Sequence, residues 1–149
     1  MMELKQIIDH SGISCSGIIV ELTESGYLEG TPAVRVWNDM KKLRIQIALD
    51  DFGTGYSNLM NISNLEPDIV KLDRGFTLKA LSRSYEYQLM QYVIEMVHKL
   101  NQYVCVEGVE TKEDLEKIKA LGPDLIQGYY YSKPCSRDEF LKKFFGYFE

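Results

Sequence analysis

The sequence predicts an α/β fold in which about five parallel strands alternate with helices. Short apolar runs alternate along the chain with longer segments whose apolar residues recur at helical spacing. Most of the short runs are apolar along their whole length rather than at alternate positions, which is typical of parallel strands buried on both faces of a sheet. A polar or charged residue stands at or next to the end of each run. We therefore expect the strand ends to carry the functional side chains.

The composition fits one soluble domain with a core of its own. The chain has 149 residues, of which 45% are hydrophobic and 26% are charged, and it contains no repeat or linker. Seventeen Lys and Arg against 22 Asp and Glu give a formal net charge of -5, and the basic residues are scattered. This pattern argues against duplex nucleic acid as a partner. If the substrate is an anion, bound metal would have to supply the neutralising charge.

Targeting and redox signals are weak in this chain. No apolar run is long enough to cross a bilayer, and the first ten residues lack the layout of a secretory signal. We expect a cytoplasmic segment without membrane contact, although a full-length parent protein can be membrane-attached. The cysteines Cys15, Cys105 and Cys135 are odd in number and have no C-x-x-C spacing, so we expect buried, inert thiols rather than disulfides or a zinc site.

Apolar spacing and capping signals locate the helices. We predict helices at residues 1–10, for about three turns after Pro32, at residues 84–100, from Thr111 to Leu121 and after Ser136. The segment from Ser136 to Glu139 has the form of a capping box, and Thr111 is a candidate N-cap. A short helical turn is also expected at residues 59–65. The apolar stripes of these helices are expected to face the core.

Each of the five predicted strands brings one polar side chain to its end. These side chains belong to Glu21, Asp50, Lys71, Glu107 and Gln127. In a parallel barrel the carboxyl ends of all strands open on one face, where active sites are built, so we expect the five to converge. A lysine inside a buried strand is rare unless it is paired or functional, because its charge is costly to desolvate. Lys71 is therefore either a structural salt-bridge partner or part of a site.

The stretch at residues 45–59 carries the most chemical information. An apolar strand runs directly into Asp50 and Asp51, and a turn containing Gly53 and Gly55 follows. A carboxylate pair at a strand end can hold a hard divalent cation, and glycines let a ligand approach the main chain. The alternative is an acidic turn in which one aspartate only caps the next segment. Residue types alone leave both interpretations open.

The predicted site contains carboxylates, one lysine and one amide, without a cysteine or histidine ligand. Ligation by oxygen alone favours Mg²⁺ or Mn²⁺. The successive carboxylates Asp50 and Asp51 suit a pair of metals about 4 Å apart, which would activate water for in-line displacement at phosphorus. Lys71 would then orient the water, and Glu107 would accept its proton.

Five blocks in this order resemble the EAL-domain phosphodiesterases of bacterial cyclic di-GMP signalling. They are ELTES at 21–25, ALDDFGTGYSNL at 48–59, DIVKLD at 68–73, VEGVET at 106–111 and QGYYYSKP at 127–134. The resemblance extends from residue 18 to the C-terminal helix. It implies a partial TIM-like (β/α) barrel whose family linearises cyclic di-GMP to pGpG with Mg²⁺ or Mn²⁺.

The resemblance also implies roles for the residues at the strand ends. Glu21 and Asp50 would be metal ligands, and Asp51 would bind a second metal. Lys71 would contact the catalytic water, and Glu107 would serve the metal pair or the proton transfer.

Substrate-binding or supporting roles are implied for a further group. Gln127 would lie beside the metal site, Glu24 would brace the loop that begins at Asp51, and Glu110 would support the site. Gly53 and Gly55 belong to that same loop.

The chain also departs from the family pattern. The E-A-L segment with its metal-binding glutamate, and the asparagine on the next strand, precede the equivalent of Glu3 in the family and are not replaced here. We therefore expect residues 1–149 to form a single truncated EAL domain with the last five of eight strands, where such barrels take about 250 residues. Weak metal binding and inactivity in isolation would follow. The open barrel would expose strand edges at 18–21 and 125–127, so we expect either homo-oligomers through those edges or through barrel helices, or a chain that is only marginally stable alone.

Two other functions remain open from the sequence. One is a barrel enzyme of the enolase type, in which carboxylates hold Mg²⁺ and a lysine abstracts a proton. The Asp50–Asp51 pair and its glycine turn favour phosphoryl chemistry over that reaction. The other is a degenerate EAL module that binds cyclic di-GMP or a protein partner without hydrolysis.

Overall fold

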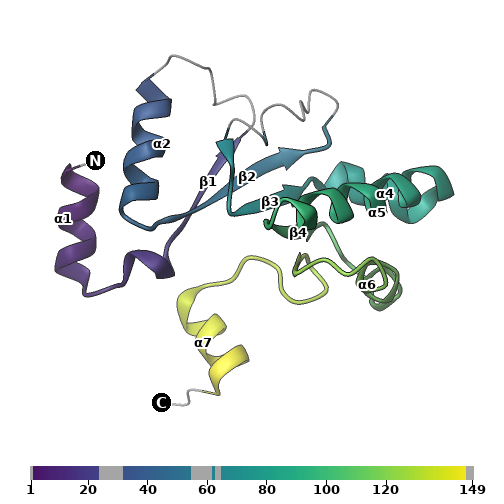
Figure 1. The fold of residues 1–149 in the computed structure, drawn as a ribbon. Coiled ribbons are helices and arrows are strands. Elements are labelled where there is room, and N and C mark those ends of the chain that lie inside the picture. The colour runs from purple at the N-terminus through teal and green to yellow at the C-terminus, as the bar shows by residue number, and fades with distance from the viewer. Residues whose placement is uncertain (1, 24–31, 55–61, 63–64, 147–149) are drawn as a thin grey trace.

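One parallel sheet organises the molecule. The computed structural model describes residues 2–23, 32–54, 62 and 65–146. Five strands pair in chain order, each parallel to its neighbours. They are β1 (Ile19–Thr23), β2 (Gln46–Phe52), β3 (Ile69–Leu72), β4 (Tyr103–Glu107) and β5 (Leu125–Gln127). The predicted α/β class with five parallel strands is confirmed (Figure 1).

Helices alternate with these strands. They are α1 (Met2–Ser11), α2 (Pro32–Lys42), α4 (Arg74–Ser82), α5 (Ser84–Lys99), α6 (Lys112–Lys119) and α7 (Arg137–Phe145), with a 3₁₀ turn at Cys15–Gly17. Five of the six helices follow the predicted positions, and the predicted turn at 59–65 lies largely outside the described residues. Among the described helices, none combines the length and apolarity that a bilayer crossing requires.

Helix α4 is the helix that the sequence analysis missed. It begins directly after β3, where the Asp73 side chain accepts a hydrogen bond of 2.7 Å from the Gly75 N–H. The carboxylate thus satisfies one of the amides that the first turn leaves unpaired. Only Asp73 separates β3 from α4, and only Arg83 separates α4 from α5. Both boundaries are therefore too short to show in the apolar periodicity.

The two predicted caps are confirmed by the side-chain hydrogen bonds. Thr111 accepts from the Asp114 N–H, and Asp114 accepts in turn from the Thr111 N–H. Ser136 and Glu139 form the same reciprocal pair at the start of α7. Each cap of this kind stabilises its helix by about 1 kcal/mol.

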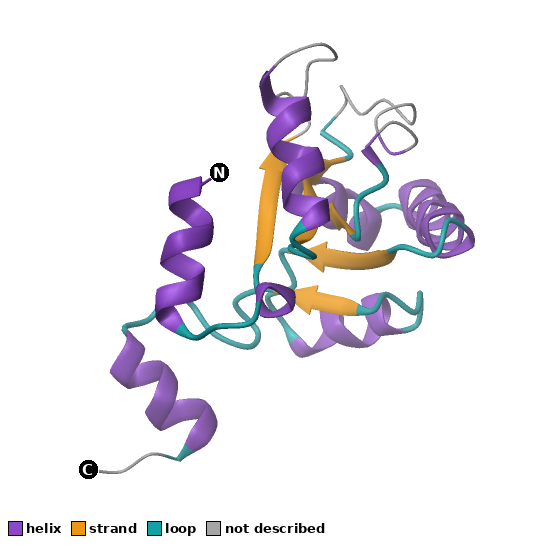
Figure 2. Ribbon diagram, turned by 60° about the vertical axis from the view of Figure 1, so that its left-hand side comes forward, coloured by secondary structure: helices purple, strands orange, loops and turns teal. Residues whose placement is uncertain are grey.

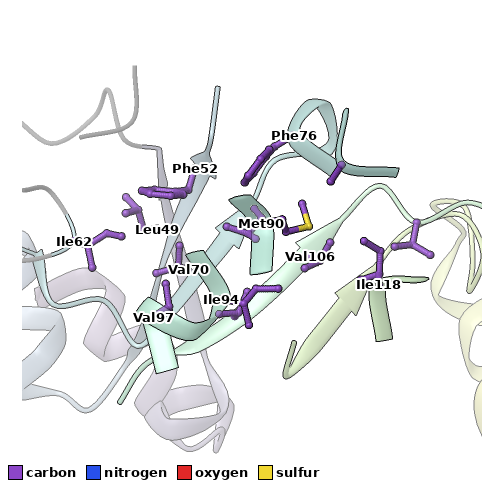
Figure 3. Close-up of a cluster of buried hydrophobic side chains, with 14 of the residues drawn as sticks. Leu49, Phe52, Ile62, Val70, Phe76, Met90, Ile94, Val97, Val106 and Ile118 are labelled. Carbon is purple, nitrogen blue, oxygen red and sulfur yellow. The ribbon is translucent and has the colours of Figure 1, made fainter. Parts of the chain in front are cut away.

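The main core lies between one face of the sheet and the helices α2, α4, α5 and α6. Figure 3 shows strand residues such as Val70 and Val106 meeting Met90 and Ile94 of α5. Full burial of such a side chain contributes about 1.5–3 kcal/mol. Figure 2 shows that the two terminal helices, α1 and α7, lie apart from this helical layer.

The opposite face of the sheet is only partly covered. Its centre holds a small buried cluster of Ala48, Ile69 and Cys105, but at the two edges Ile19 is 48% exposed and Leu125 is 46% exposed. The expected burial of both faces therefore holds for β3 and is wrong for the edge strands β1 and β5. An apolar run indicates which residues can be buried, but it does not reveal what covers them.

The predicted apolar face of α7 is also largely uncovered among the described residues. Phe140, Phe144 and Phe145 are between 45% and 62% exposed. The Phe140 ring contacts the other two at a tilt, with its centroid 5.0 Å from that of Phe144 and 5.8 Å from that of Phe145.

A Pro-Asp pair precedes both β3 and β5 and ties each strand to the one before it. The Asp68 carboxylate accepts a 2.8 Å hydrogen bond from the Ile47 N–H, and the Asp68 N–H donates to the Ile47 carbonyl at 2.9 Å. Asp124 makes the same two contacts with Val104, at 2.8 and 3.1 Å. Because one residue both donates and accepts, each pair holds its strand in register.

We expect Asp124→Ala to lower the free energy of unfolding by about 1 kcal/mol at pH 7. Partial burial alone raises the pKa of Asp124, but hydrogen bonds from Val104 and His98 hold that pKa below its usual value. Since the folded pKa lies below the unfolded one, this stabilisation is complete above about pH 5 and is lost as the pH falls through the folded pKa. Urea unfolding from pH 7 to pH 3 measures the difference.

The matched control is Asp138→Ala, because the Asp138 side chain is 91% exposed. Its effect should stay small at every pH. A difference between wild type and Asp124→Ala that is the same at pH 3 and pH 7 would contradict the assignment.

Candidate functional site

Three carboxylates from three strands meet at one lysine. Lys71 on β3 is only 6% exposed. Its Nζ lies 2.7 Å from Glu107 Oε1, 2.9 Å from Glu21 Oε1 and 3.1 Å from Asp50 Oδ1. The structure thus brings together four of the five side chains that the sequence places at strand ends.

Strand register explains this convergence. Asp50 pairs with Thr23 on β1, and Lys71 pairs with Cys105 on β4. Neighbouring residues of a parallel sheet that lie in register point to the same face. An irregularity in the β2–β3 pairing between Leu49 and Phe52 adds a residue to β2 at the aspartate pair.

Asp51 occupies this irregularity. Its backbone has φ of +61°, which is uncommon for a residue with a side chain, and the residue is exposed. Although Asp51 follows Asp50 directly, it is not one of the three carboxylates that form ion pairs with Lys71. Because of this left-handed backbone, Asp51 does not follow the regular strand pattern in which successive side chains point to opposite faces of the sheet.

The charges of this cluster do not cancel. Three carboxylates surround one ammonium, which leaves two negative charges in excess. Burial by itself lowers the pKa of Lys71, but the adjacent carboxylates of Glu107, Glu21 and Asp50 outweigh burial and raise that pKa above its usual value. Lys71 is therefore a permanent cation in the folded protein.

The donor set fits a hard divalent cation. All three acidic partners offer oxygen, and they carry more negative charge than Lys71 neutralises. Asp50 Oδ1 is buried and, although it lies 3.1 Å from Nζ, it accepts no well-oriented hydrogen bond from the described residues. Within the described part of the chain, no three or more acidic, histidine or cysteine side chains stand ready-made around a metal position.

The supporting residues are placed less uniformly. Gln127 pairs in register with Glu107 at the open edge of the sheet and is exposed. An open hollow of about 800 Å³ extends from Gln127 along β5 to Phe140 of α7. Glu24 and Gly55 lie outside the described residues.

Gly53 lies at the start of the loop after β2, and its backbone needs glycine. Its φ is +102°, and an added Cβ would lie 2.8 Å from the ring of Phe76 on α4. Gly53 thus lies against Phe76 in the first turn of α4.

Arg74 is a site neighbour that the sequence analysis did not identify. Its Nε and Nη2 donate to Glu110 Oε1 at 3.2 and 2.8 Å, which links the segments after β3 and β4. The side chain crosses Gly108, where φ is +80° and an added Cβ would lie 2.4 Å from the Arg74 Cγ. A charged residue directly after a strand end was the available signal. The predicted supporting residue Glu110 therefore has a defined partner.

The structure corrects one expectation for the cysteines. Cys105 is buried as predicted, but Cys15 is only partly buried and Cys135 is exposed. Burial raises the pKa of Cys105 to about 11, and the nearby Glu107 adds to this effect. Thus one thiol of the three is well protected.

At pH 8 we expect iodoacetamide to alkylate Cys135 at least about 100-fold faster than Cys105, because the thiolate is the reactive form. Peptide mass spectrometry on the folded protein measures both rates. In urea the two rates should become similar. Comparable rates in the folded protein would contradict the burial of Cys105.

Comparison with known proteins adds to this geometry. The EAL-domain family model matches residues 1–134. The cyclic di-GMP phosphodiesterase PdeF of Escherichia coli (strain K12) is 32% identical over 134 residues, which are 89% of this chain and 18% of that protein.

Solved structures agree with the sequence match. The EAL enzyme Bd1971, in its form bound to cAMP and cyclic-di-GMP, matches with a TM-score of 0.87 and 31% identity over 93% of this chain and 37% of that chain. BlrP1 of Klebsiella pneumoniae, in a manganese and cyclic di-GMP complex, matches with a TM-score of 0.79 and 26% identity over 89% and 35% of the two chains. The chain spans less than two fifths of the length of each of these three proteins.

Proposed function

Because this chain belongs to the EAL-domain family, we propose that it forms the C-terminal part of a metal-dependent phosphodiesterase that hydrolyses cyclic di-GMP to linear pGpG in bacterial signalling. One observation carries the proposal: Glu21, Asp50 and Glu107, from three different strands, point at a single position at the carboxyl end of the sheet. That is where barrel enzymes build their active sites.

The proposed ligands of two Mg²⁺ or Mn²⁺ ions are Glu21, Asp50, Asp51 and Glu107. When bound, such a metal pair lowers the pKa of water and stabilises the phosphate oxygens. Lys71 orients the attacking water from its buried position, since its charge is fixed and its three donors can reach several acceptors. Glu107 accepts the proton of that water, and Glu107 Oε1 already lies 2.7 Å from Lys71.

The remaining predicted residues take supporting roles in this proposal. Gln127 contacts substrate at the mouth of the hollow beside β5. Glu110 holds the segment after β4 through Arg74. Glu24, Gly53 and Gly55 shape the loops around the aspartate pair.

The test of this function separates binding from turnover. The 149-residue polypeptide is incubated with cyclic di-GMP and Mn²⁺ while pGpG is followed by chromatography, and binding is measured by calorimetry in Ca²⁺. The glutamate of the E-A-L segment and the asparagine implied by the resemblance are not among these residues, so we expect these 149 residues to be inactive in isolation. Turnover at the rate of complete family members would contradict this expected inactivity.

Asp50→Asn should weaken metal-dependent binding, whereas Asp138→Asn on exposed α7 should leave binding unchanged. If Asp50→Asn binds like the wild type, the assigned ligand set is wrong.

The second candidate is a degenerate module that binds cyclic di-GMP or a protein partner without hydrolysis. The placement of an ammonium among the three carboxylates favours it, because Lys71 already supplies a cation to all three. Cyclic di-GMP binding in EDTA that matches binding in Ca²⁺, with no pGpG formed, would support this candidate.

We also propose that copies of the chain associate through β1 and β5. These strands form the two edges of the described sheet, and Ile19 and Leu125 are exposed on them. Light scattering should detect a dimer or larger species, and lysine substitutions at both positions should reduce it. A monomer at every protein concentration across a 100-fold range would contradict this proposal.

A further inference from the structure

The carboxylates around Lys71 would repel one another without a cation. Glu21, Asp50 and Glu107 have oxygens within 3.1 Å of one point. The Asp50 and Glu107 side chains are only 21% and 18% exposed, whereas Glu21 is 52% exposed. Water screens charges poorly at such depth, so like charges held this close destabilise the fold. Some positive group must therefore balance them whenever no metal is present.

Lys71 is the cation that balances them. Among the described residues, it is the only basic side chain that pairs with any of the three carboxylates. The nearby Arg74 is directed to Glu110 instead. The burial of Lys71 between β2 and β4 holds its ammonium beside the three carboxylates as long as no other cation takes its place.

A divalent cation and this ammonium compete for the same oxygens. Mg²⁺ binds oxygen at about 2.1 Å, so a metal that takes the Glu21, Asp50 and Glu107 oxygens now within 3.1 Å of Nζ has to occupy the place of the ammonium. Metal entry thus requires the carboxylates to exchange one cation for another.

We infer that Lys71 is an internal counter-ion that holds Glu21, Asp50 and Glu107 together without metal, and that a divalent cation binds by displacing its ammonium from them. The exchange rests on the proposed metal-dependent function, whereas the counter-ion role does not. Lys71 therefore has two opposing effects. It keeps the three carboxylates together, and it lowers the affinity of the site for metal.

The test compares Lys71→Gln with the wild type in two measurements. In EDTA, Lys71→Gln should unfold several degrees lower, because three carboxylates lose their only cation. In calorimetry, Lys71→Gln should bind Mn²⁺ at least about 10-fold more tightly, because no ammonium competes. Mn²⁺ should therefore raise the unfolding temperature of the variant more than that of the wild type.

The matched controls are Lys79→Gln and Lys71→Arg. Lys79 lies on α4 and is exposed, so its replacement should change neither measurement. Lys71→Arg keeps the charge and should keep the weak Mn²⁺ affinity. Equal unfolding temperatures for wild type and Lys71→Gln in EDTA would overturn the counter-ion role, and equal Mn²⁺ affinities would overturn the exchange.

If Lys71→Gln does not fold, a lysine-acetylation footprint of the wild-type chain tests the exchange instead. Acetylation by an activated ester, read by mass spectrometry, should spare Lys71 in EDTA and reach it as Mn²⁺ saturates the site. Protection that is the same with and without Mn²⁺ would overturn the exchange. If neither wild type nor Lys71→Gln binds Mn²⁺, the proposed function fails together with the exchange, while the melting temperatures in EDTA still decide the counter-ion role.

Discussion

Gly128→Ala is expected to lower the free energy of unfolding by about 3 kcal/mol or more. An added Cβ would lie 2.0 Å from the Val109 carbonyl oxygen and 2.5 Å from the Val109 nitrogen. Both are backbone atoms, and neither can move freely. Val109 donates a hydrogen bond to the Gln127 carbonyl at 3.3 Å and accepts one from Tyr130 at 3.1 Å.

Urea unfolding monitored by circular dichroism measures this loss. The matched control is Gly17→Ala, because a Cβ at Gly17 meets no atom within 4 Å and no positive φ opposes it. The control should change stability little. Equal unfolding midpoints for the two variants would show that the segment after β5 does not lie against Val109.

Glu107→Gln is expected to weaken Mn²⁺ binding by at least about 100-fold. Residues that only support a metal ligand alter affinity by about 10- to 100-fold, so a direct ligand should cost no less. Glu107 also makes the shortest contact of Lys71, at 2.7 Å, and its side chain is only 18% exposed. Glu107→Gln and Lys71→Gln should therefore shift the affinity in opposite directions, which general destabilisation would not do.

Calorimetry with Mn²⁺ measures this affinity. Glu113→Gln is the control, because Glu113 pairs with Lys117 on the surface of α6 and its side chain is 77% exposed. That variant should bind Mn²⁺ like the wild type. A Glu107→Gln affinity within threefold of the wild type would remove Glu107 from the proposed ligand set.

Much of the fold could be predicted because its elements are locally encoded. The helical spacing of Met90, Ile94 and Val97 is a property of one segment, and all three are buried as that spacing indicates. Helix α4 was missed because it follows β3 without a break, so its start depends on the cap at Asp73 rather than on periodicity. The exposure of Ile19 and Leu125 agrees with the open strand edges expected at residues 18–21 and 125–127, although their apolar runs alone would have indicated burial.

The candidate site could be predicted as far as the positions of the strand ends could be predicted. Asp50, Lys71 and Glu107 converge because parallel strands in register bring their ends to one edge. The sequence left open whether Lys71 is a salt-bridge partner, and the structure shows that it is one, with three carboxylates. The backbone of Asp51 and the contact between Arg74 and Glu110 depend on how distant segments meet, which no local pattern reports.

The order of the strands has a consequence for how the protein is made. Each described strand after β1 pairs with its predecessor, and the paired residues are separated by 20 to 34 positions, as in Cys105 with Leu125 and Ile69 with Tyr103. Closing loops of this size costs little entropy, and no strand has to wait for a later one. The Pro-Asp pairs at Asp68 and Asp124 join two of these strands, β3 and β5, to the strand before each of them. We expect the sheet to grow from the N-terminal side during translation, with β5 docking last, which arrested nascent chains of increasing length can test by protease resistance.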